Sequence, residues 1–397
     1  MLHGVSRDES AALVRQAIGD DAPQALIEAV HERSEGNPFF IGELARLVVA
    51  EPGLPESELV RRAGIPASVR DVVHRRLVSL PAETSSLVQM MATIGRETHL
   101  GLLSRASGLP IDRCIDDLEP ALVNRLIVDV PEHPGTVRFS HALVREVVLN
   151  DMSLLRRSRL HLTIADAIEA TSRLSDDTAE ILAEHLWQAV SLGVADRAAH
   201  ALERAAEVAL RRYAYQTADN LLERALVLRQ GMLPEDADLD AELDTITLLL
   251  SVRRVRFGFE RARMNSPIER AKELARKTSR DRVLAEVVWT DWAGAATSCD
   301  LVSSERLARD LVALAEVSDD LLIQASGYAA WGIHCWHIGH ITEAVEYVDR
   351  AVALVDVWVD DNDHVEGGAL TGLMEHLLLT RGFRIVYHAL AGSTLPG

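Results

Sequence analysis

The chain has 397 residues, which is enough for two or three domains of about 150 residues, each with its own hydrophobic core. Apolar residues make up 48% and charged residues 25% of the sequence, which is typical of a folded globular protein and excludes a disordered one. With 60 acidic against 41 basic residues, the net charge of −19 repels nucleic-acid phosphates and anionic lipids.

The sequence has no basic and apolar leader at its start, and no apolar run of the ~18 residues that a membrane span requires. Its three cysteines are far apart and odd in number, so they do not form a disulfide framework. We therefore expect a cytoplasmic protein without a membrane segment.

The first 50 residues predict a helical segment with a sharp turn in its middle. Residues 8–19, 23–33 and 39–50 have the apolar spacing of amphipathic helices. Between the last two, Gly36 and Pro38 break one helix and begin the next, because proline fits the first turn of a helix. Three prolines and two glycines in residues 51–66 predict a linker.

Residues 67–152 are expected to form a winged-helix-like domain. Helical patterns over 69–79, 82–94, 99–106 and 111–124 precede two short β-branched runs at 126–130 and 136–139. The turn residues PEHPG join these runs into a two-stranded hairpin. Three helices followed by such a hairpin are the outline of a winged helix.

Residues 153–397 predict an array of paired helices that resembles tetratricopeptide repeats. In that repeat, small residues at positions separated by twelve and then seven residues lie where the two helices touch. Two segments match this spacing and one matches it weakly. The three sets are Ala206, Ala218 and Ala225; Gly332, Ala344 and Ala351; and, more weakly, Trp292, Ser304 and Leu311.

Several stretches resemble a known family. HERSEGNPFFIGEL is similar to the motif in the helical lid of STAND-class AAA+ signal-transduction ATPases, which include the MalT-like and LuxR-type transcriptional regulators. Further segments are similar to the winged helix and the following helix of the same regulators: IPASVRDVVHRRLVSLP, LIVDVPEHPGTVRFSHALVREVVLNDM and LLRRSRLHLTIADAIEA. The resemblance implies a lid in residues 1–50, with Pro38 near a bound adenine and Gly36 shaping the turn.

The chain departs from that family in its phosphate-binding parts. Its only lysines, Lys272 and Lys277, lie outside any Gly-Lys-Ser/Thr sequence, so a Walker A loop is absent. We find no helix-turn-helix pattern near the C-terminus and expect the chain to be the middle part of a larger regulator. ATP or ADP would then bind only with a phosphate-loop partner, and the isolated chain would hold no cofactor.

Two further groups of residues allow functional and structural interpretations. His334, Cys335, His337 and His340 could bind a metal, but the repeat pattern places them in a helix and turn where they also pack or face solvent. The arginines between Arg253 and Arg263 alternate with two phenylalanines, which suits single-stranded nucleic acid, a protein partner or a solvated surface paired with acids.

No recognised catalytic motif occurs in the sequence. We therefore predict a non-catalytic regulatory module that senses a ligand or a protein or peptide partner through its helical repeats and acts on an ATPase-domain partner. One alternative is a nucleic-acid-binding protein that acts through the winged helix, although the candidate recognition helix at 111–124 has four acids and one arginine. The other alternative is a split ATPase completed by a phosphate-loop partner.

Overall fold

A computed structural model describes residues 5–34, 36–38, 40–42, 44–45, 67–171, 176–233, 237–361 and 373–391. The predicted linker at 51–66 and part of the predicted helix at 39–50 lie outside the described residues. The described chain is mostly helical, with one small sheet and a long helical array, which confirms the predicted fold class. None of its described helices is long and apolar enough to cross a lipid bilayer.

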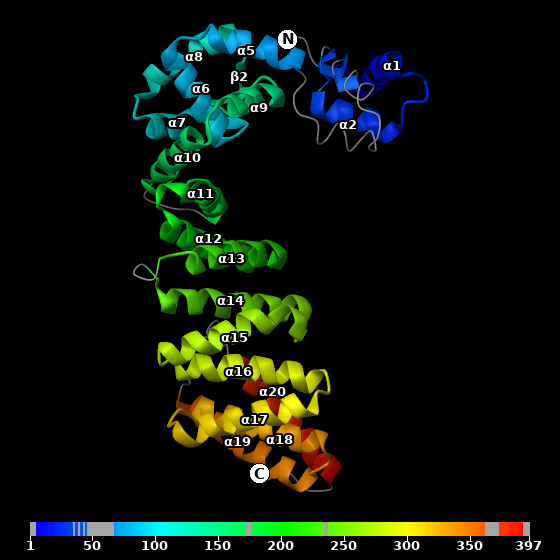
Figure 1. Ribbon diagram of the computed structural model, residues 1–397, viewed down its shortest axis with the longest axis vertical. Helices are drawn as coiled ribbons and strands as arrows, with labels where there is room; N and C mark the ends of the chain where they lie inside the picture. Colours follow the sequence, from blue (N-terminus) through cyan, green and yellow to red (C-terminus); the bar gives the residue numbers. More distant parts are fainter. Residues whose placement is uncertain are drawn as a thin grey trace. The chain divides into compact units, whose positions relative to one another are not determined.

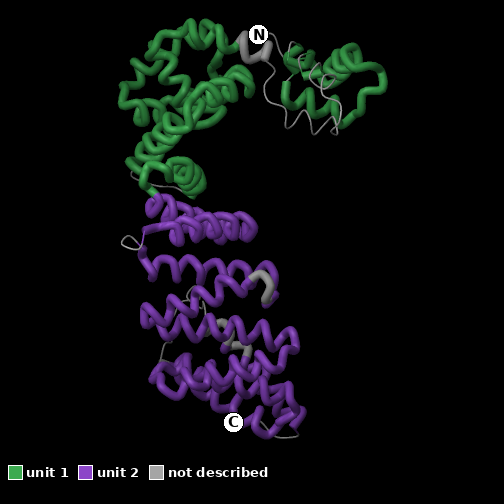
Figure 2. Tube along the Cα trace, viewed as in Figure 1, with its two compact units in different colours: residues 1–194 green, residues 195–397 purple. Residues whose placement is uncertain are grey.

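The chain divides into two compact units, Met1–Val194 and Ala195–Gly397 (Figure 2). In the first unit, the helices that neighbour the strands in the sequence pack against the small sheet (Figure 1). Its elements are α1 (Arg7–Ile18), α2 (Gln24–Ser34), α5 (Ala67–Val78), α6 (Ala82–Ile94), β1 (Glu97–His99), α7 (Leu100–Ser107), α8 (Ile111–Val123), β2 (Ile127–Asp129), β3 (Thr136–Phe139), α9 (Ala142–Asp151), α10 (Leu154–Glu169), α11 (Asp176–Gln188) and the 3-10 helix η1 (Val190–Leu192).

Helices α1 and α2 pack against each other over a small core. Helix α1 begins with a capping box, in which the Ser6 hydroxyl accepts a hydrogen bond from the Glu9 amide and the Glu9 carboxylate accepts one from the Ser6 amide. Val14 of α1 and Leu26 and Val30 of α2 are fully buried between them. The apolar periodicity of the sequence therefore determines which faces of these two helices meet.

The sheet has three antiparallel strands in the order β1-β3-β2, so the prediction of a two-stranded hairpin was incomplete. β2 and β3 are the predicted pair, and β1 adds to the free edge of β3, with Thr98 opposite Val137. Thr98 is buried while Glu97 and His99 are exposed. A strand of three residues is too short for this alternation to be recognised in the sequence.

The second unit is an array of antiparallel helices in which consecutive helices contact each other (Figure 1). Its helices are α12 (Ala195–Arg211), α13 (Tyr215–Gln230), α14 (Leu239–Phe257), α15 (Arg261–Lys277), α16 (Asp281–Thr297), α17 (Leu301–Val317), α18 (Leu321–His337), α19 (Ile341–Asp361) and α20 (Leu373–Ala391). Helices α12, α14, α16 and α18 begin at residues 195, 239, 281 and 321, a longer spacing than the ~34 residues of a tetratricopeptide repeat.

Four of the tight turns in this array have the same backbone geometry. Each places one residue in the left-handed region, at Tyr213, Ser279, Cys299 and Gly339. In each turn the next amide donates a hydrogen bond to the carbonyl five residues before it, as Ala214 does to Ala209 at 2.9 Å. This bond closes the end of the first helix and aims the chain back along it. The repeated turn therefore creates the repeated hairpin.

Candidate functional site

The six predicted small residues are all buried on helices that pair in the array. Gly332 of α18 has the tightest surroundings of these. A Cβ atom at Gly332 would lie 2.9 Å from Val348 Cγ2 and 3.1 Å from the carbonyl oxygen of Ala344, both on α19. Ala344 and Ala351 are fully buried. The two backbones therefore approach each other so closely that position 332 has no room for a side chain.

The other two sets occupy equivalent hairpins. Ala206 lies on α12 and Ala218 and Ala225 lie on α13, and all three are fully buried. The weaker set, Trp292 on α16 with Ser304 and Leu311 on α17, is buried in the same way although its residues are larger. The structure thus brings the members of each set into one helical hairpin.

The predicted lid turn is well defined around Gly36. Its φ of +72° is in the region that favours glycine, and its carbonyl accepts a hydrogen bond of 2.8 Å from the Val5 amide. Pro38 follows at the first turn of a helical segment and is exposed. Gly36 therefore shapes a turn that leaves the ring of Pro38 accessible.

His141 connects this turn to the segment that follows the sheet. Its Nδ1 accepts a hydrogen bond from the Leu143 amide at 3.3 Å, so the proton is on Nε2, which donates to the carbonyl of Ser34. The ring of Phe40 lies edge-on against the imidazole at 4.5 Å. Two of the stretches that resemble STAND regulators, the one around Gly36 and the one that contains His141, thus meet at this buried histidine, a contact that sequence reasoning did not anticipate.

Two of the arginines predicted as a possible nucleic-acid surface, Arg253 and Arg256, are engaged within the array. Arg253 Nε lies 3.1 Å from a carboxylate oxygen of Asp219 on α13, and Arg256 pairs with the same carboxylate. Arg253 also contacts Glu223. The side chains of Arg261 and Arg263 lie outside the described residues. Arg253 and Arg256 therefore join α14 to α13 instead of presenting a free basic surface.

The histidine and cysteine group of α18 does not converge on one point. His334 is buried and hydrogen-bonds Ser304 at 3.2 Å, and His340 lies 3.5 Å from Glu343. His337 lines a separate hollow together with Trp289 and Trp292. Burial raises the pKa of the Cys335 thiol to about 12, which disfavours the thiolate that a metal needs. No cluster with metal-binding geometry occurs among the described residues.

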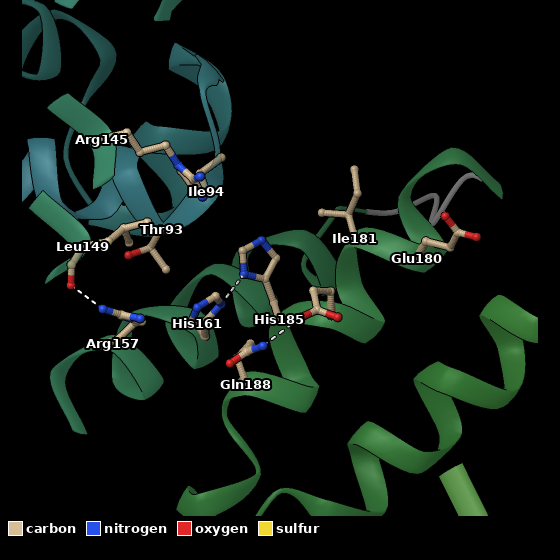
Figure 3. A pocket seen from close by; sticks show the side chains of 11 residues that line it. Thr93, Ile94, Arg145, Leu149, Arg157, His161, Glu180, Ile181, His185 and Gln188 are labelled. Atoms are coloured by element: carbon tan, nitrogen blue, oxygen red, sulfur yellow. Dashed lines mark hydrogen bonds between the residues drawn. The ribbon is translucent and has the colours of Figure 1, made fainter. Parts of the chain in front are cut away.

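A pocket of about 500 Å³ in the first unit is lined by two neighbouring histidines, the buried His185 and the half-buried His161 (Figure 3). We call it the histidine pocket. The Nδ1 atoms of His161 on α10 and His185 on α11 are 2.8 Å apart, so one ring donates to the other. Burial is the main cause that lowers the pKa of each to about 4, and both rings are neutral at pH 7.

Two arginines line the same pocket. Arg145 donates to the carbonyl of Ala92 at 2.8 Å, and Arg157 donates to the carbonyl of Leu149. Burial and the neighbouring Arg157 lower the pKa of Arg145. Neither guanidinium forms an ion pair with a described carboxylate. Chemically, two such guanidiniums can bind an anion, while the exposed Glu180 and Glu184 of α11 partly offset their charge.

The array has a polar and apolar groove along α17, α18 and α19, which we call the Trp331 groove. Two adjoining hollows of about 300 and 320 Å³ share Arg309, Trp331 and Glu343 as lining residues. The indole of Trp331 donates to Glu343 at 3.0 Å, which lowers the pKa of that carboxyl, and the Arg309 guanidinium lies 4.9 Å from the indole ring centre. Val302, which is 82% exposed, adds an apolar contact at one end.

Comparisons with known proteins show two kinds of similarity, to a family model and to solved structures. A Domain of unknown function (DUF8739) matches residues 6–51. A crystal structure of a Signal Transduction ATPase with Numerous Domains (STAND) protein with a tetratricopeptide repeat sensor, from Pyrococcus horikoshii, aligns with 98% of this chain at 12% identity and a TM-score of 0.30. The chain spans 58% of that protein's length. No curated protein matches significantly.

Proposed function

We propose that this chain is the regulatory and interaction part of a STAND-type signalling protein of the LuxR-type or MalT-like kind. It would bind a protein partner through the helical array, and residues 67–152 would act as a winged helix that transmits the bound state. The Trp331 groove is the observation that carries this proposal. It combines an aromatic ring, both signs of charge and an exposed apolar rim.

The groove suits an extended segment of a partner protein. Tryptophan and arginine contribute most to binding at protein interfaces, because they combine large contact areas with hydrogen bonds. Here Trp331 and Arg309 are held in place by Glu343 and Glu305, which limits the side-chain entropy lost on binding. Glu316 and Glu343 leave carboxylates beside the ring to pair with basic residues of the partner.

Affinity capture from a lysate of the source cells tests this function with matched variants. We expect at least one protein to be retained by the full chain and lost with Trp331→Ala and with Arg309→Ala. Arg306→Ala is the control, because Arg306 lies on the same helix, is exposed and does not line the groove. Retention of the same proteins by all four chains would refute the groove as the interaction surface.

A nucleotide would belong to a complex with a phosphate-loop partner. Most of the affinity for ATP comes from groups that meet its phosphates, and the lid contributes only the exposed Pro38 and its turn. We expect the chain alone to bind Mg-ATP more weakly than millimolar. Calorimetry that gives a micromolar dissociation constant, lost in Pro38→Ala, would contradict this expectation.

Direct binding to DNA is not part of the proposed function. The candidate recognition helix α8 exposes Asp112, Asp116 and Glu119, and its Arg113 pairs with Asp117 at 3.1 Å. Such a surface repels the phosphate backbone, which supplies most of the affinity that does not depend on sequence. In a gel-shift assay at ~150 mM salt we expect no sequence-selective complex at sub-micromolar protein.

A further inference from the structure

A second hollow in the array is lined almost entirely by apolar and aromatic side chains. We call it the tryptophan pocket. It has a volume of about 230 Å³ and its walls include Trp289 and Trp292 of α16, Ile333 of α18, and Thr380 and Phe383 of α20. Trp289, Trp292, Ile333 and Thr380 are buried, while Phe383 is 42% exposed and lies at the mouth.

The pocket exists because α20 packs across helices that precede it by several elements. Helix α20 contacts α16 and α18 as well as its neighbour α19. The ring of Tyr387 stacks on Trp336 of α18 at 4.1 Å, and His388 lies 2.9 Å from Asp349 of α19. These contacts fix α20 as one wall of the pocket. The opposite wall on α16 includes the small residues Ala293 and Ala296, which leave space between the two helices.

Two polar atoms of the pocket's side chains have no hydrogen-bond partner within the described part of the chain. They are the indole Nε1 of Trp292 and the hydroxyl of Thr380, and both are shielded from solvent. The indole nitrogen can only donate, so it requires an acceptor. A buried polar group without a partner is unfavourable, and nearly all such groups in native proteins are satisfied.

Among the side chains that the structure describes, no Asp, Glu, Lys or Arg lines the pocket. Of the described lining residues, the exposed His337 is the one that can take up a proton, and desolvation lowers its pKa. An ionic ligand would lose its hydration there without a counter-charge, whereas a neutral ring would bury apolar surface against two indoles. For comparison, an apolar cavity of about 150 Å³ is large enough for benzene.

We propose that the tryptophan pocket binds a small neutral ring compound that carries a hydroxyl or carbonyl oxygen, and that this oxygen accepts a hydrogen bond from Trp292. The compound would be an effector of the array. This site shares no lining residue with the Trp331 groove, so its test is independent of the capture experiment.

Three probes of similar size test the proposal on the full chain: benzyl alcohol, toluene and benzoate. Tryptophan fluorescence and calorimetry should show that the first two bind, with dissociation constants of about millimolar or lower, and that benzoate binds at least about tenfold more weakly. Trp187→Phe removes an indole of the first unit and should leave all three affinities unchanged.

Variants then locate the site. Trp292→Phe keeps a ring but removes the donor, so it should weaken benzyl alcohol by about threefold to tenfold and change toluene by less than about twofold. Ala296→Leu fills the pocket and should abolish binding of both; Ile333→Phe fills it from α18 should the first variant fail to fold. Absence of benzyl alcohol binding at about 10 mM, equal binding of benzoate, or an equal effect of Trp292→Phe on alcohol and toluene would overturn the proposal.

Discussion

Two hairpins of the array have the same turn and the same spacing of contact positions, yet they fill those positions differently. In α18 and α19 the positions are Gly332, Ala344 and Ala351. In α15 and α16 the residues with that spacing are Lys272, Leu284 and Asp291, and the ammonium of Lys272 lies 2.5 Å from the Asp291 carboxylate with both side chains buried. One backbone geometry therefore accepts either close packing of small residues or a buried ion pair.

A third solution occurs in the first unit, where α10 and α11 meet through His161 and His185. This pair is polar like the lysine and aspartate, but its members are neutral, because burial disfavours their charged forms. The three contacts therefore respond to different changes. A side chain added at Gly332 clashes with α19, loss of Lys272 removes the ammonium from the Asp291 carboxylate, and acid protonates imidazoles that are neutral in the folded chain.

The largest effect is expected at the ion pair. Lys272→Met leaves the Asp291 carboxylate buried without its cation and should lower the free energy of unfolding by about 3–5 kcal/mol. Lys277→Met is the matched control, because Lys277 is exposed and pairs with Glu273 on the surface, where the change should stay below about 1 kcal/mol. Urea unfolding of both variants measures the difference. If both variants lost a similar free energy of unfolding, the buried ion pair of α15 and α16 would be no more important for stability than a surface pair.

Acid is expected to cause the second largest loss of stability, by protonating His161 and His185 where α10 and α11 meet. The pKa values of His161 and His185 are lowered to about 4 in the folded chain, so the unfolded chain binds more protons between that pH and about 6.5. Stability should fall as the pH drops through this window, by about 2–4 kcal/mol for the pair after allowance for solvent screening.

Carboxylates also titrate near the lower end of this window, so the measurement is a difference. The free energy of unfolding of the wild type minus that of His161→Gln/His185→Gln should decrease from pH 6.5 to pH 4. A difference that is constant with pH would show that the pair is not buried in its neutral form.

At the contact between α18 and α19, Gly332→Ala should lower the free energy of unfolding by about 1–3 kcal/mol. The added methyl group would lie 2.9 Å from Val348 Cγ2 and must displace α19. Ala344→Leu should act in the same direction through the same contact. Thermal unfolding followed by circular dichroism is the measurement. A chain with unchanged stability in both variants would contradict the assignment of these positions as packing contacts.

The smallest effect, expected for Gly382→Ala, has the opposite sign. This variant is the control for replacing a helical glycine that makes no close contact. Gly382 of α20 is exposed, and a Cβ atom there would have no neighbour within 4 Å. Gly382→Ala should therefore stabilise the chain by about 0.5–1 kcal/mol through helix propensity alone. Destabilisation by this change would mean that glycine substitutions in the array do not report on packing.

The helical elements could be predicted from the sequence because their apolar periodicity is local. The spacing of Ala206, Ala218 and Ala225 is enough to place these residues in one hairpin, and their energetic role remains a prediction. Lys272 and Asp291 have the same spacing, but they are not small residues and so do not match the repeat pattern.

Other features could not be found in this way because they depend on distant segments. Strand β1 has too few residues to show a period. The contact of His141 with Ser34 joins residues more than one hundred positions apart, and the tryptophan pocket needs α20 to return to α16. The acidic partners of Arg253 lie on the preceding helix and give no signal at the arginines themselves.

The most direct test of the proposed function is hydrogen exchange of the full chain with and without a partner obtained by affinity capture. We predict protection of amides in residues 301–347, which carry the Trp331 groove, and no such protection in Trp331→Ala. Protection confined to Met1–Val194, or protection of the array that persists in Trp331→Ala, would contradict the account.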